Sequence, residues 1–388
     1  MNYLFVIFVG LLIPSLCYNN ENYNVRDKRA ILKRRIFNFT MPVNYYYDFT
    51  SKCQIIEKAI AHISDYTCIT FKKVKKPFDN IGIIFKQVKK DSYVEDNLEK
   101  GKSTIIYVNK DCTLRIGCIK SLLGRAFGLI PHVQRWDRDT YVEVKLDNIQ
   151  DEYKKYYTKI SGLDVKIMNT AFDFGSIMNY ESKQHSINGK PSYKSKWNKL
   201  YNKMLGQRVD FSHNDIKLLN DLHCGKVCPK KVKGCINGGY PDPLNCGHCR
   251  CPKGYVGKLC GIAAPSDKEC GKTILKASHD IKSLQIKSNI QCNYLIKADP
   301  GYKVIVYVDD AVLPNENPCT NTYGLEIKNR YDKGATGLSI CGRVKDVETK
   351  PIFSQVLVRY YGRKENHYAN IRYEAVTKET AREFDYVK

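Results

Sequence analysis

The first half of the chain alternates between stretches with helical and with strand-like hydrophobic spacing. Apolar residues from Ile55 to Ile63 recur at helical intervals and predict an amphipathic helix that ends near Asp65. Short runs rich in β-branched and aromatic residues around this helix predict strands at 37–42, 45–47, 81–88 and 103–108.

A second predicted helix begins near Gly117, and a last one covers 214–222 with Ser212 or Asn214 as its N-cap. Gly128 suits the turn that ends the second helix and redirects the chain. The stretch between these helices shows no regular pattern. The apolar stripe of the second helix consists of Ile119, Leu122, Leu123, Ala126 and Phe127.

The last third of the chain alternates with the period of a strand, as in 302–308 and 356–361. Several such strands separated by turn signals predict a β-sandwich over 270–376, followed by a charged tail, 377–388. At the other end, an apolar run before Cys17 predicts a signal peptide, 1–17. No later stretch is apolar for long enough to span a membrane, so we expect a secreted, extracellular protein.

Sixteen cysteines behind a predicted signal peptide indicate disulfides formed in an oxidising compartment. Cleavage after Cys17 leaves an odd number, which allows a free thiol or a disulfide between chains. The basic run that ends at Arg29 predicts a processing site with a pro-segment, 18–29, although a solvated basic cluster is the alternative. Asn38 is the acceptor of the one glycosylation sequon found.

The formal net charge of +23 is compatible with binding to acidic glycans, anionic membranes or nucleic acid. The basic residues are spread along the chain, which is also rich in Lys, Asn, Ile and Tyr, so base composition is an alternative cause of the charge. Secretion argues against a nucleic-acid partner. The length and the apolar fraction of 43% leave room for two or three globular domains.

The segment 117–142 carries the strongest functional signal. It resembles the active-site helix of the astacin family of zinc endopeptidases, whose motif is H-E-x-x-H-x-x-G-x-x-H-E followed by an Arg and an Asp-Arg-Asp run. Gly128, Arg135 and 137–139 match this motif. The family's three zinc-ligand positions are occupied by Ser121, Arg125 and Pro131, and its general-base position by Leu122.

These four substitutions remove the chemistry that the resemblance implies. Catalytic zinc requires three strong protein donors, and proline, arginine and a serine hydroxyl do not supply them. Leucine cannot act as a general base. We therefore expect no metal site, no catalytic residues and no cofactor, whereas active family members bind zinc. Arg125 is expected to project into the former active-site cleft.

Further residues support the resemblance and extend the departure from the family pattern. The segment 173–180 resembles the family's Met-turn and retains Met178 and Tyr180. The glutamate that normally follows the third histidine and receives the new N-terminal amine is replaced by His132. The pro-segment lacks the F-x-G-D motif that places a carboxylate on zinc in active relatives.

Cysteine spacing after residue 224 changes to an EGF-like pattern over 225–261, and 270–376 resembles a CUB domain. The resemblance thus implies an α+β metzincin-like domain, a twisted sheet plus helices, over 30–224, a small EGF-like module and an all-β CUB sandwich. Calcium-binding signatures are missing from both modules.

The resemblance assigns no disulfide partner to Cys53, Cys112 or Cys118. The family pairings are Cys68 with Cys224, Cys228 with Cys246, Cys235 with Cys249, Cys251 with Cys260, Cys270 with Cys292, and Cys319 with Cys341.

The leading functional hypothesis is a secreted pseudopeptidase, a glycoprotein that binds extracellular protein or glycan through its CUB domain and vestigial cleft. One alternative is an active zinc metalloendopeptidase with a rearranged metal site, for which His132 and His185 are the histidines near the cleft segments. Another is a structural component of an extracellular matrix, held through the odd cysteine.

Overall fold

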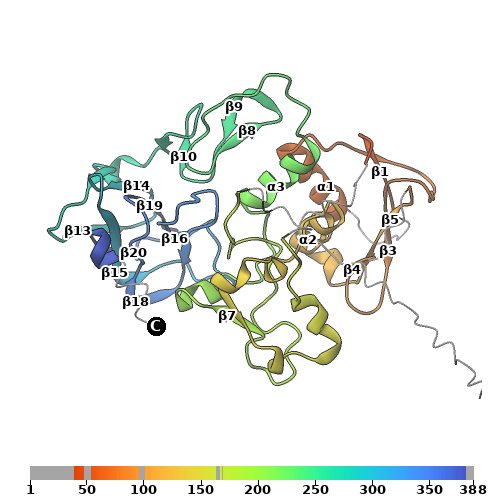
Figure 1. Ribbon diagram of the computed structural model, residues 1–388, viewed down its shortest axis with the longest axis horizontal. Coiled ribbons are helices and arrows are strands. Elements are labelled where there is room, and N and C mark those ends of the chain that lie inside the picture. Colours follow the sequence, from red (N-terminus) through yellow and green to blue (C-terminus); the bar gives the residue numbers. More distant parts are fainter. Residues whose placement is uncertain (1–38, 48–53, 96–100, 163–166, 168, 382–388) are drawn as a thin grey trace, which may run out of the picture.

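The computed structural model describes residues 39–47, 54–95, 101–162, 167 and 169–381. Three parts follow one another along the chain (Figure 1): a helix-and-sheet part, a small part around β8 to β10, and a β-sandwich. The predicted signal peptide, pro-segment, glycosylation site and Cys53 lie outside the described residues.

A five-stranded sheet with the order β2-β1-β3-β5-β4 forms one side of the first part. β1, β2, β3 and β5 run parallel, and the short edge strand β4 runs antiparallel to β5. The predicted strand at 37–42 is wrong over its described residues, because 39–42 form no strand and β1 begins after Pro42, which has no N–H to donate. The strand bounds are β1 Val43–Tyr47, β2 Phe71–Lys73, β3 Ile83–Gln87, β4 Tyr93–Val94 and β5 Thr104–Val108.

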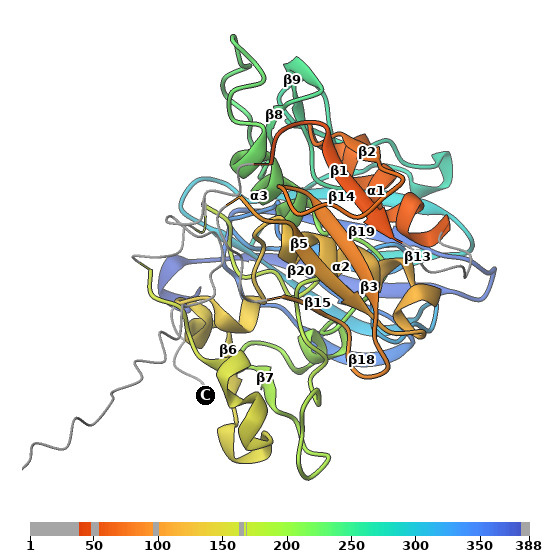
Figure 2. The same ribbon diagram turned by 90° about the vertical axis from the view of Figure 1, so that its right-hand side faces the viewer.

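Three α-helices pack with this sheet, and in Figure 2 α2 lies behind β3 and β5. The predicted helices are confirmed: α1 spans Gln54–Tyr66, α2 Ile116–Ala126 and α3 His213–His223. Ser212 is the N-cap of α3 and forms a capping box with Asp215. All five residues of the predicted α2 stripe are buried, and Gly128 adopts a φ of 102° in the turn that follows α2.

Between α2 and α3 the chain forms 3-10 turns and one small antiparallel pair, β6 with β7. This agrees with the absence of a regular hydrophobic pattern in this stretch. The strands are β6 Val142–Val144 and β7 Tyr193–Ser195. The 3-10 helices of the described chain are Cys112–Leu114, His132–Gln134, Arg138–Thr140, Leu146–Asn148, Asp151–Tyr157, Lys199–Lys203 and Lys268–Cys270.

The small second part consists of two antiparallel pairs, β8 with β9 and β10 with β11. Buried Tyr255 of this part packs with Leu295 and Leu357 of the sandwich, so the part is fixed to the sandwich by apolar contact. Its strands are β8 Tyr240–Asp242, β9 Asn245–Arg250, β10 Tyr255–Val256 and β11 Ile262–Ala263.

The predicted β-sandwich consists of two sheets with the orders β12-β14-β19-β16-β17 and β13-β20-β15-β18. Alternating buried positions, as in β20, place one side of the strand in the core between the sheets. The strand bounds are β12 Ile274–Lys276, β13 Lys282–Lys287, β14 Gln291–Lys297, β15 Lys303–Val312, β16 Gly324–Lys328, β17 Leu338–Ile340, β18 Arg343–Glu348, β19 Gln355–Tyr361 and β20 Tyr368–Val376.

The hydrophobic cores do not follow the order of the three parts. One core joins the first sheet to α1, α2 and α3. A second core is continuous from the irregular stretch, including Phe172 and Phe174, into the sandwich, including Leu325 and Leu338. Because the irregular stretch shares its core with the sandwich, the C-terminal part supports one side of the first part.

Seven disulfides join described cysteines, and six are the pairs that the family resemblance implies. The seventh joins Cys112 to Cys118, with a Cα–Cα distance of 5.3 Å. The sequence had left the disulfide partners of both residues open.

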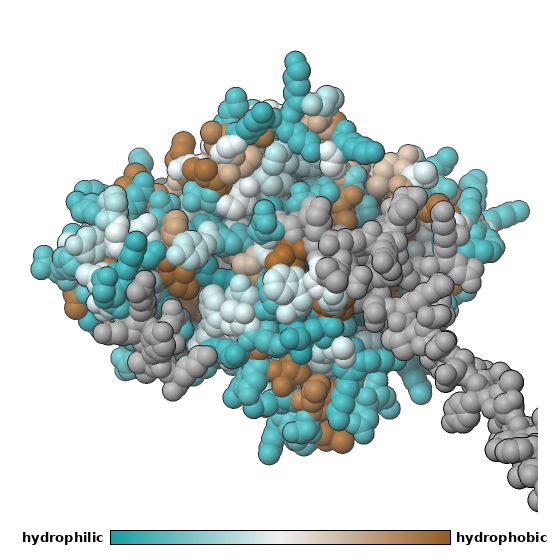
Figure 3. All heavy atoms as spheres, in the orientation of Figure 1, coloured by the Kyte–Doolittle hydropathy of each residue, from teal (hydrophilic) through white to brown (hydrophobic). Residues whose placement is uncertain are grey.

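The surface is mainly hydrophilic on the face shown in Figure 3, where hydrophobic side chains form separate small patches. In the described part of the chain no helix combines the length and the apolar composition needed to cross a bilayer.

Candidate functional site

A cavity of about 520 Å³ lies between the end of β4, one face of α2 and the Met-turn segment. Ser121, Leu122, Arg125 and Pro131 all line it, so the structure brings together the four positions that sequence predicts for the former active site. We call these four residues the cleft wall. Met178 and Tyr180 line the same cavity, so the retained Met-turn residues also lie there.

Ser121 and Arg125 lie one helical turn apart and share the cavity-facing side of α2, as helical spacing requires. The Ser121 hydroxyl donates a hydrogen bond to the Cys118 carbonyl oxygen at 2.8 Å. Arg125 is partly buried, and its guanidinium has no hydrogen bond or ion pair with any described residue. The cleft wall therefore presents one fixed positive charge.

The donor chemistry of this site does not fit zinc. Leu122 and Pro131 have no donor atom, and Arg125 is a cation that does not lose its proton in proteins. Among the residues that the structure describes, no group of three or more His, Cys, Asp or Glu side chains is arranged to hold a metal ion. No catalytic step through a metal is therefore derived for this site.

Met178 packs beneath α2: a Cβ added to Gly124 would come within 3.1 Å of the Met178 sulfur. Tyr180 is also buried, and its ring lies 5.5 Å from that of Tyr157 and 5.7 Å from that of His185. Arg208 holds the backbone of this segment by donating to the carbonyl oxygens of Ile177 and Asn179, each at 2.9 Å.

His185 lines the cavity and stacks on Tyr153 at a ring distance of 4.1 Å. Burial lowers the pKa of His185, Asp91 raises it and Arg125 lowers it further, with a net downward shift. His185 is therefore mainly neutral at physiological pH. It is one of the two histidines considered for a rearranged metal site, and it reaches the cavity.

The disulfide between Cys112 and Cys118 joins the turn after β5 to the first turn of α2. Cys118 lines the cavity, so this bond lies at the cleft itself. Sequence reasoning missed the pairing because the family resemblance implies a partner for Cys112 elsewhere, in the 89–100 region, where the chain has no cysteine.

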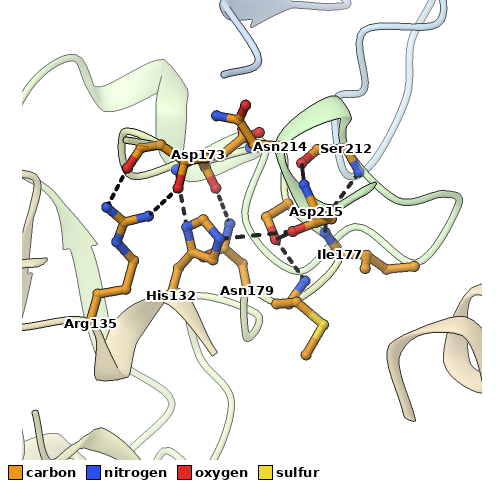
Figure 4. A network of polar contacts seen from close by, with 12 residues as sticks. His132, Arg135, Asp173, Ile177, Asn179, Ser212, Asn214 and Asp215 are labelled. Carbon is orange, nitrogen blue, oxygen red and sulfur yellow. Dashed lines mark hydrogen bonds and ion pairs between the residues drawn. The ribbon is translucent and has the colours of Figure 1, made fainter. Parts of the chain in front are cut away.

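His132, the other candidate histidine, does not line this cavity. Its ring is buried, and its Nδ1 accepts a hydrogen bond from the Asp173 backbone N–H at 3.1 Å. Its Nε2 lies 3.9 Å from Asp215 Oδ1. Figure 4 shows His132 between the two aspartates. We call His132, Asp173, Ser176 and Asp215 the buried polar cluster.

Asp215 accepts the most hydrogen bonds in this cluster. Ser176 Oγ donates to its Oδ1 at 2.6 Å, and the backbone N–H groups of Ile177 and Ser212 donate to its Oδ2 at 3.1 and 2.9 Å. It thereby joins the Met-turn to the start of α3. The spacing from Ser212 to Asp215 is that of a capping box, and it could have drawn attention to Asp215 in the sequence. Nothing in the sequence indicates the contacts of Asp215 with Ser176 and Ile177.

Burial disfavours the charged forms of the titratable groups in this cluster. Burial raises the pKa of Asp215 to about 7, and the nearby Asp173 contributes to this rise. Burial also raises the pKa of Asp173, and burial with the charges of Arg135 and Arg330 holds the pKa of His132 well below its usual range. The histidine that replaces the family's glutamate is therefore an uncharged structural residue.

A loop of the sandwich, residues 329–337, reaches this cluster, and we call it the docking loop. Its Thr336 N–H donates to Asp173 Oδ1 at 3.1 Å. Its Arg330 donates to the Phe172 carbonyl oxygen at 2.7 Å, with the guanidinium 5.0 Å from the Trp197 ring. Sequence reasoning missed the docking loop, because its partners lie more than a hundred residues away and its buried charges follow no periodic pattern.

The docking loop also contacts the segment and the helix that flank the cluster. Asp332 Oδ2 accepts hydrogen bonds from the Ala171 N–H at 2.9 Å and from Asn214 Nδ2 at 2.8 Å. Lys333 is buried, and its Nζ donates to the Arg330 carbonyl oxygen at 2.6 Å. The sandwich is thus joined to the Met-turn segment by a polar contact as well as by a shared hydrophobic core.

The remaining motif residues are structural. Buried Arg135 makes two parallel hydrogen bonds to the Asp137 carboxylate, at 2.9 and 2.8 Å, and a third to the Thr170 carbonyl oxygen at 2.7 Å. Arg138 donates to Asp139 at 2.9 Å. Paired guanidinium and carboxylate groups of this kind fix loop geometry, which accounts for these residues without any catalytic role.

Comparison with known proteins gives a consistent picture for the first part. The model of the astacin peptidase family matches residues 32–224. Zinc metalloproteinase nas-34 of Caenorhabditis elegans is 28% identical over 383 residues, covering 94% of this chain and 60% of the relative. Zinc metalloproteinase dpy-31 of the same nematode is 31% identical over 323 residues, covering 79% of this chain and 54% of the relative.

Among solved structures, high choriolytic enzyme 1, a hatching-enzyme zinc protease from the medaka fish Oryzias latipes, is 27% identical. The match covers 50% of this chain and 94% of that chain, with a TM-score of 0.42. The chain spans about 60% or less of the length of the two nematode relatives.

Proposed function

Because the chain belongs to the astacin family through residues 32–224, we propose that it is a secreted, catalytically inactive astacin homologue that binds peptides in its cleft. The observation that carries this proposal is the cavity wall formed by Ser121, Leu122, Arg125 and Pro131. The cavity is retained, and these four residues are unsuited to activating water.

The shape of the site supports peptide as the ligand. β4 is the edge strand of its sheet, and Tyr93 and Val94 of β4 line the cavity. An edge strand can form backbone hydrogen bonds with an extended peptide, and neighbouring pockets then take alternate side chains. A volume of about 520 Å³ lies within the usual range for ligand sites.

The C-terminal parts are proposed to be an EGF-like module over 225–261 and a CUB domain over 270–376. Their disulfide pairs and the two-sheet sandwich support this assignment. They would add a binding surface for extracellular protein or glycan. Disulfides throughout the described chain are compatible with a secreted, extracellular protein.

Metal analysis together with a protease assay tests the proposal. Purified mature protein should contain no stoichiometric zinc and should leave casein and gelatin intact, with or without a chelator. One zinc per chain with chelator-sensitive cleavage would instead establish the alternative, an active enzyme with a rearranged metal site.

A restoration variant tests whether the cleft wall alone prevents metal binding. Ser121→His, Leu122→Glu, Arg125→His and Pro131→His together return the family's ligands and general base to a cavity that the structure retains. We expect this variant to bind one zinc. The same variant with Pro131 unchanged has two of three histidines. Its zinc affinity should be at least about tenfold weaker, because a tenfold loss corresponds to only about 1.4 kcal/mol of binding free energy. Equal zinc binding by both variants would contradict the assignment of Pro131 to the third ligand position.

A further inference from the structure

Arg125 holds an uncompensated charge inside the cleft. It lines the cavity from α2 and is partly buried there, and its guanidinium has no hydrogen-bond or ion-pair partner among the described residues. A guanidinium has five N–H donors in a planar fork. A partly dehydrated charge without a partner is unfavourable, so a ligand that supplies an anion would stabilise it.

The charge balance of the whole cavity points in the same direction. Three arginines, Arg115, Arg125 and Arg208, line it, and Asp91 is the one acidic side chain among its described lining residues. Arg208 Nη1 donates to carbonyl oxygens, which are neutral acceptors. The cavity therefore keeps an excess of positive charge near neutral pH.

Arg125 lines the cavity from α2, one helical turn beyond Ser121, and the Met-turn residues Met178 and Tyr180 line the same cavity. In the proposed peptide complex, the chain along β4 would pass in front of this part of α2. A side chain from the middle of the peptide would then meet the Arg125 guanidinium.

We propose that Arg125 selects the ligand: the cleft binds an extended peptide that places the carboxylate of an Asp or Glu residue on this guanidinium. The inference rests on the proposed peptide-binding function and specifies its ligand class. Arginine pairs with carboxylate through two parallel hydrogen bonds, which are stronger and more directional than neutral ones. A residue that prevents zinc chemistry thus becomes the source of specificity.

An acidic peptide fits this site better than a sulfated glycan does. The positive charge lies in a cavity beside an edge strand, and four tyrosines line the same cavity: Tyr93, Tyr153, Tyr156 and Tyr180. Backbone pairing and aromatic contact suit a peptide chain with one anionic residue. A polysulfated chain would instead require a long, open basic surface, and Asp91 would oppose it.

Peptide selection with the full mature chain tests the inference. The immobilised protein is challenged with a displayed library of random peptides, in parallel with Arg125→Gln and with Arg343→Gln. Arg343 is an exposed residue of β18, far from the cavity lining, so Arg343→Gln is a control with the same loss of one positive charge. Thermal unfolding of each variant shows whether it is folded.

We expect the unaltered chain and Arg343→Gln to enrich peptides with Asp or Glu at one fixed position. For a selected peptide and its counterpart with Asn or Gln at that position, the affinity ratio should be about tenfold, equivalent to about 1.4 kcal/mol. Arg125→Gln should still select peptides but bring this ratio to about one, and Arg125→Lys should restore part of it.

The outcomes separate this inference from the function on which it rests. If the unaltered chain selects no peptides, peptide binding itself fails. If it selects peptides without an acidic position, or if Arg125→Gln keeps the acidic preference, only the role of Arg125 is refuted. Competition of the selected peptides by a sulfated polysaccharide such as heparin, abolished by Arg125→Gln, would show that the site recognises glycan sulfate and would overturn the proposal.

Discussion

The cleft wall and the buried polar cluster lie on neighbouring segments and differ in how their residues are bonded. In the cleft wall, the Ser121 side chain makes one hydrogen bond within its own helix, and the Arg125 side chain makes none with the described residues. In the buried polar cluster, Asp215 alone accepts three hydrogen bonds, from the Met-turn and from the residue that caps α3.

This difference shows which part of the site the fold depends on. The cleft wall borders an open cavity, so its residues can change without leaving buried groups unpaired. The buried polar cluster links the Met-turn, α3 and the docking loop, where each lost partner exposes an orphan donor or acceptor to an apolar core. Residues that cannot bind zinc at these positions are therefore compatible with an intact scaffold.

Removal of the Asp215 carboxylate should have the largest effect on stability. Asp215→Ala leaves the N–H groups of Ile177 and Ser212 without an acceptor and deprives the Ser176 hydroxyl of its partner. We expect a loss of about 4 kcal/mol in the free energy of unfolding, measured by denaturant titration. Asp280→Ala at an exposed position is the matched control. Similar stability of the two variants would remove the contrast between the cluster and the surface.

The pH dependence of stability should identify the same carboxyl group. Because the pKa of Asp215 is raised from 3.8 to about 7, the folded chain binds more protons than the unfolded chain in this window. Its stabilising contribution is therefore complete below pH 3.8 and is lost as pH rises through about 7.

Asp215→Asn keeps an acceptor oxygen and an amide that can donate to Ser176, but it does not titrate. Relative to this variant, the unaltered chain should lose on the order of 4 kcal/mol as pH rises across the window, at about 1.4 kcal/mol per pKa unit. Unfolding titrations of both proteins at several pH values give the difference directly. Because Asp173 contributes to the raised pKa of Asp215, the difference between the two curves includes the coupling between these two carboxyl groups. Parallel stability curves would show that Asp215 is charged throughout.

The sequence predicted the local elements of this contrast better than its long-range contacts. The apolar stripe of α2 and the Ser212 cap could be recognised because helical spacing and capping depend on neighbouring residues. The positions of the cleft wall followed from the motif, and the cavity brings all four together. The edge strand β4 was missed because its two residues, Tyr93 and Val94, are too few to show alternation.

Long-range polar contacts could not be read from local pattern. Arg330 and Asp332 lie in a loop whose composition resembles any solvated turn, yet both are held against the Met-turn side of the first part. Burial of charged side chains depends on partners far along the chain, and these partners carry no shared periodicity. The pairing of Cys112 stayed open at the sequence level for a related reason, because the family implies a distant partner where this chain uses a near one.

Removal of the Arg330 charge should have an intermediate effect. Arg330→Met keeps an apolar side chain of similar length but loses the hydrogen bond to the Phe172 carbonyl and the contact with the Trp197 ring. The buried charge also carries a desolvation cost, so we expect a net loss of about 2 kcal/mol. Arg343→Met, on the exposed side of β18, is the control. If thermal unfolding separates into two transitions only in Arg330→Met, the docking loop couples the sandwich to the first part. Equal stability of Arg330→Met and Arg343→Met would contradict that coupling.

The smallest effect is expected in the cleft wall itself, at Ser121. Its hydroxyl donates to the Cys118 carbonyl oxygen within the same helix, at a partly exposed position where water can replace the hydroxyl in Ser121→Ala. Alanine also has the higher helix propensity, which offsets the lost bond, so the free energy of unfolding should change by about 0.5 kcal/mol or less. Denaturant titration beside Asp215→Ala measures both ends of the comparison under the same conditions. A loss at Ser121 as large as that at Asp215 would mean that the cleft wall supports the fold, and the freedom of these positions to depart from the zinc motif would then need another explanation.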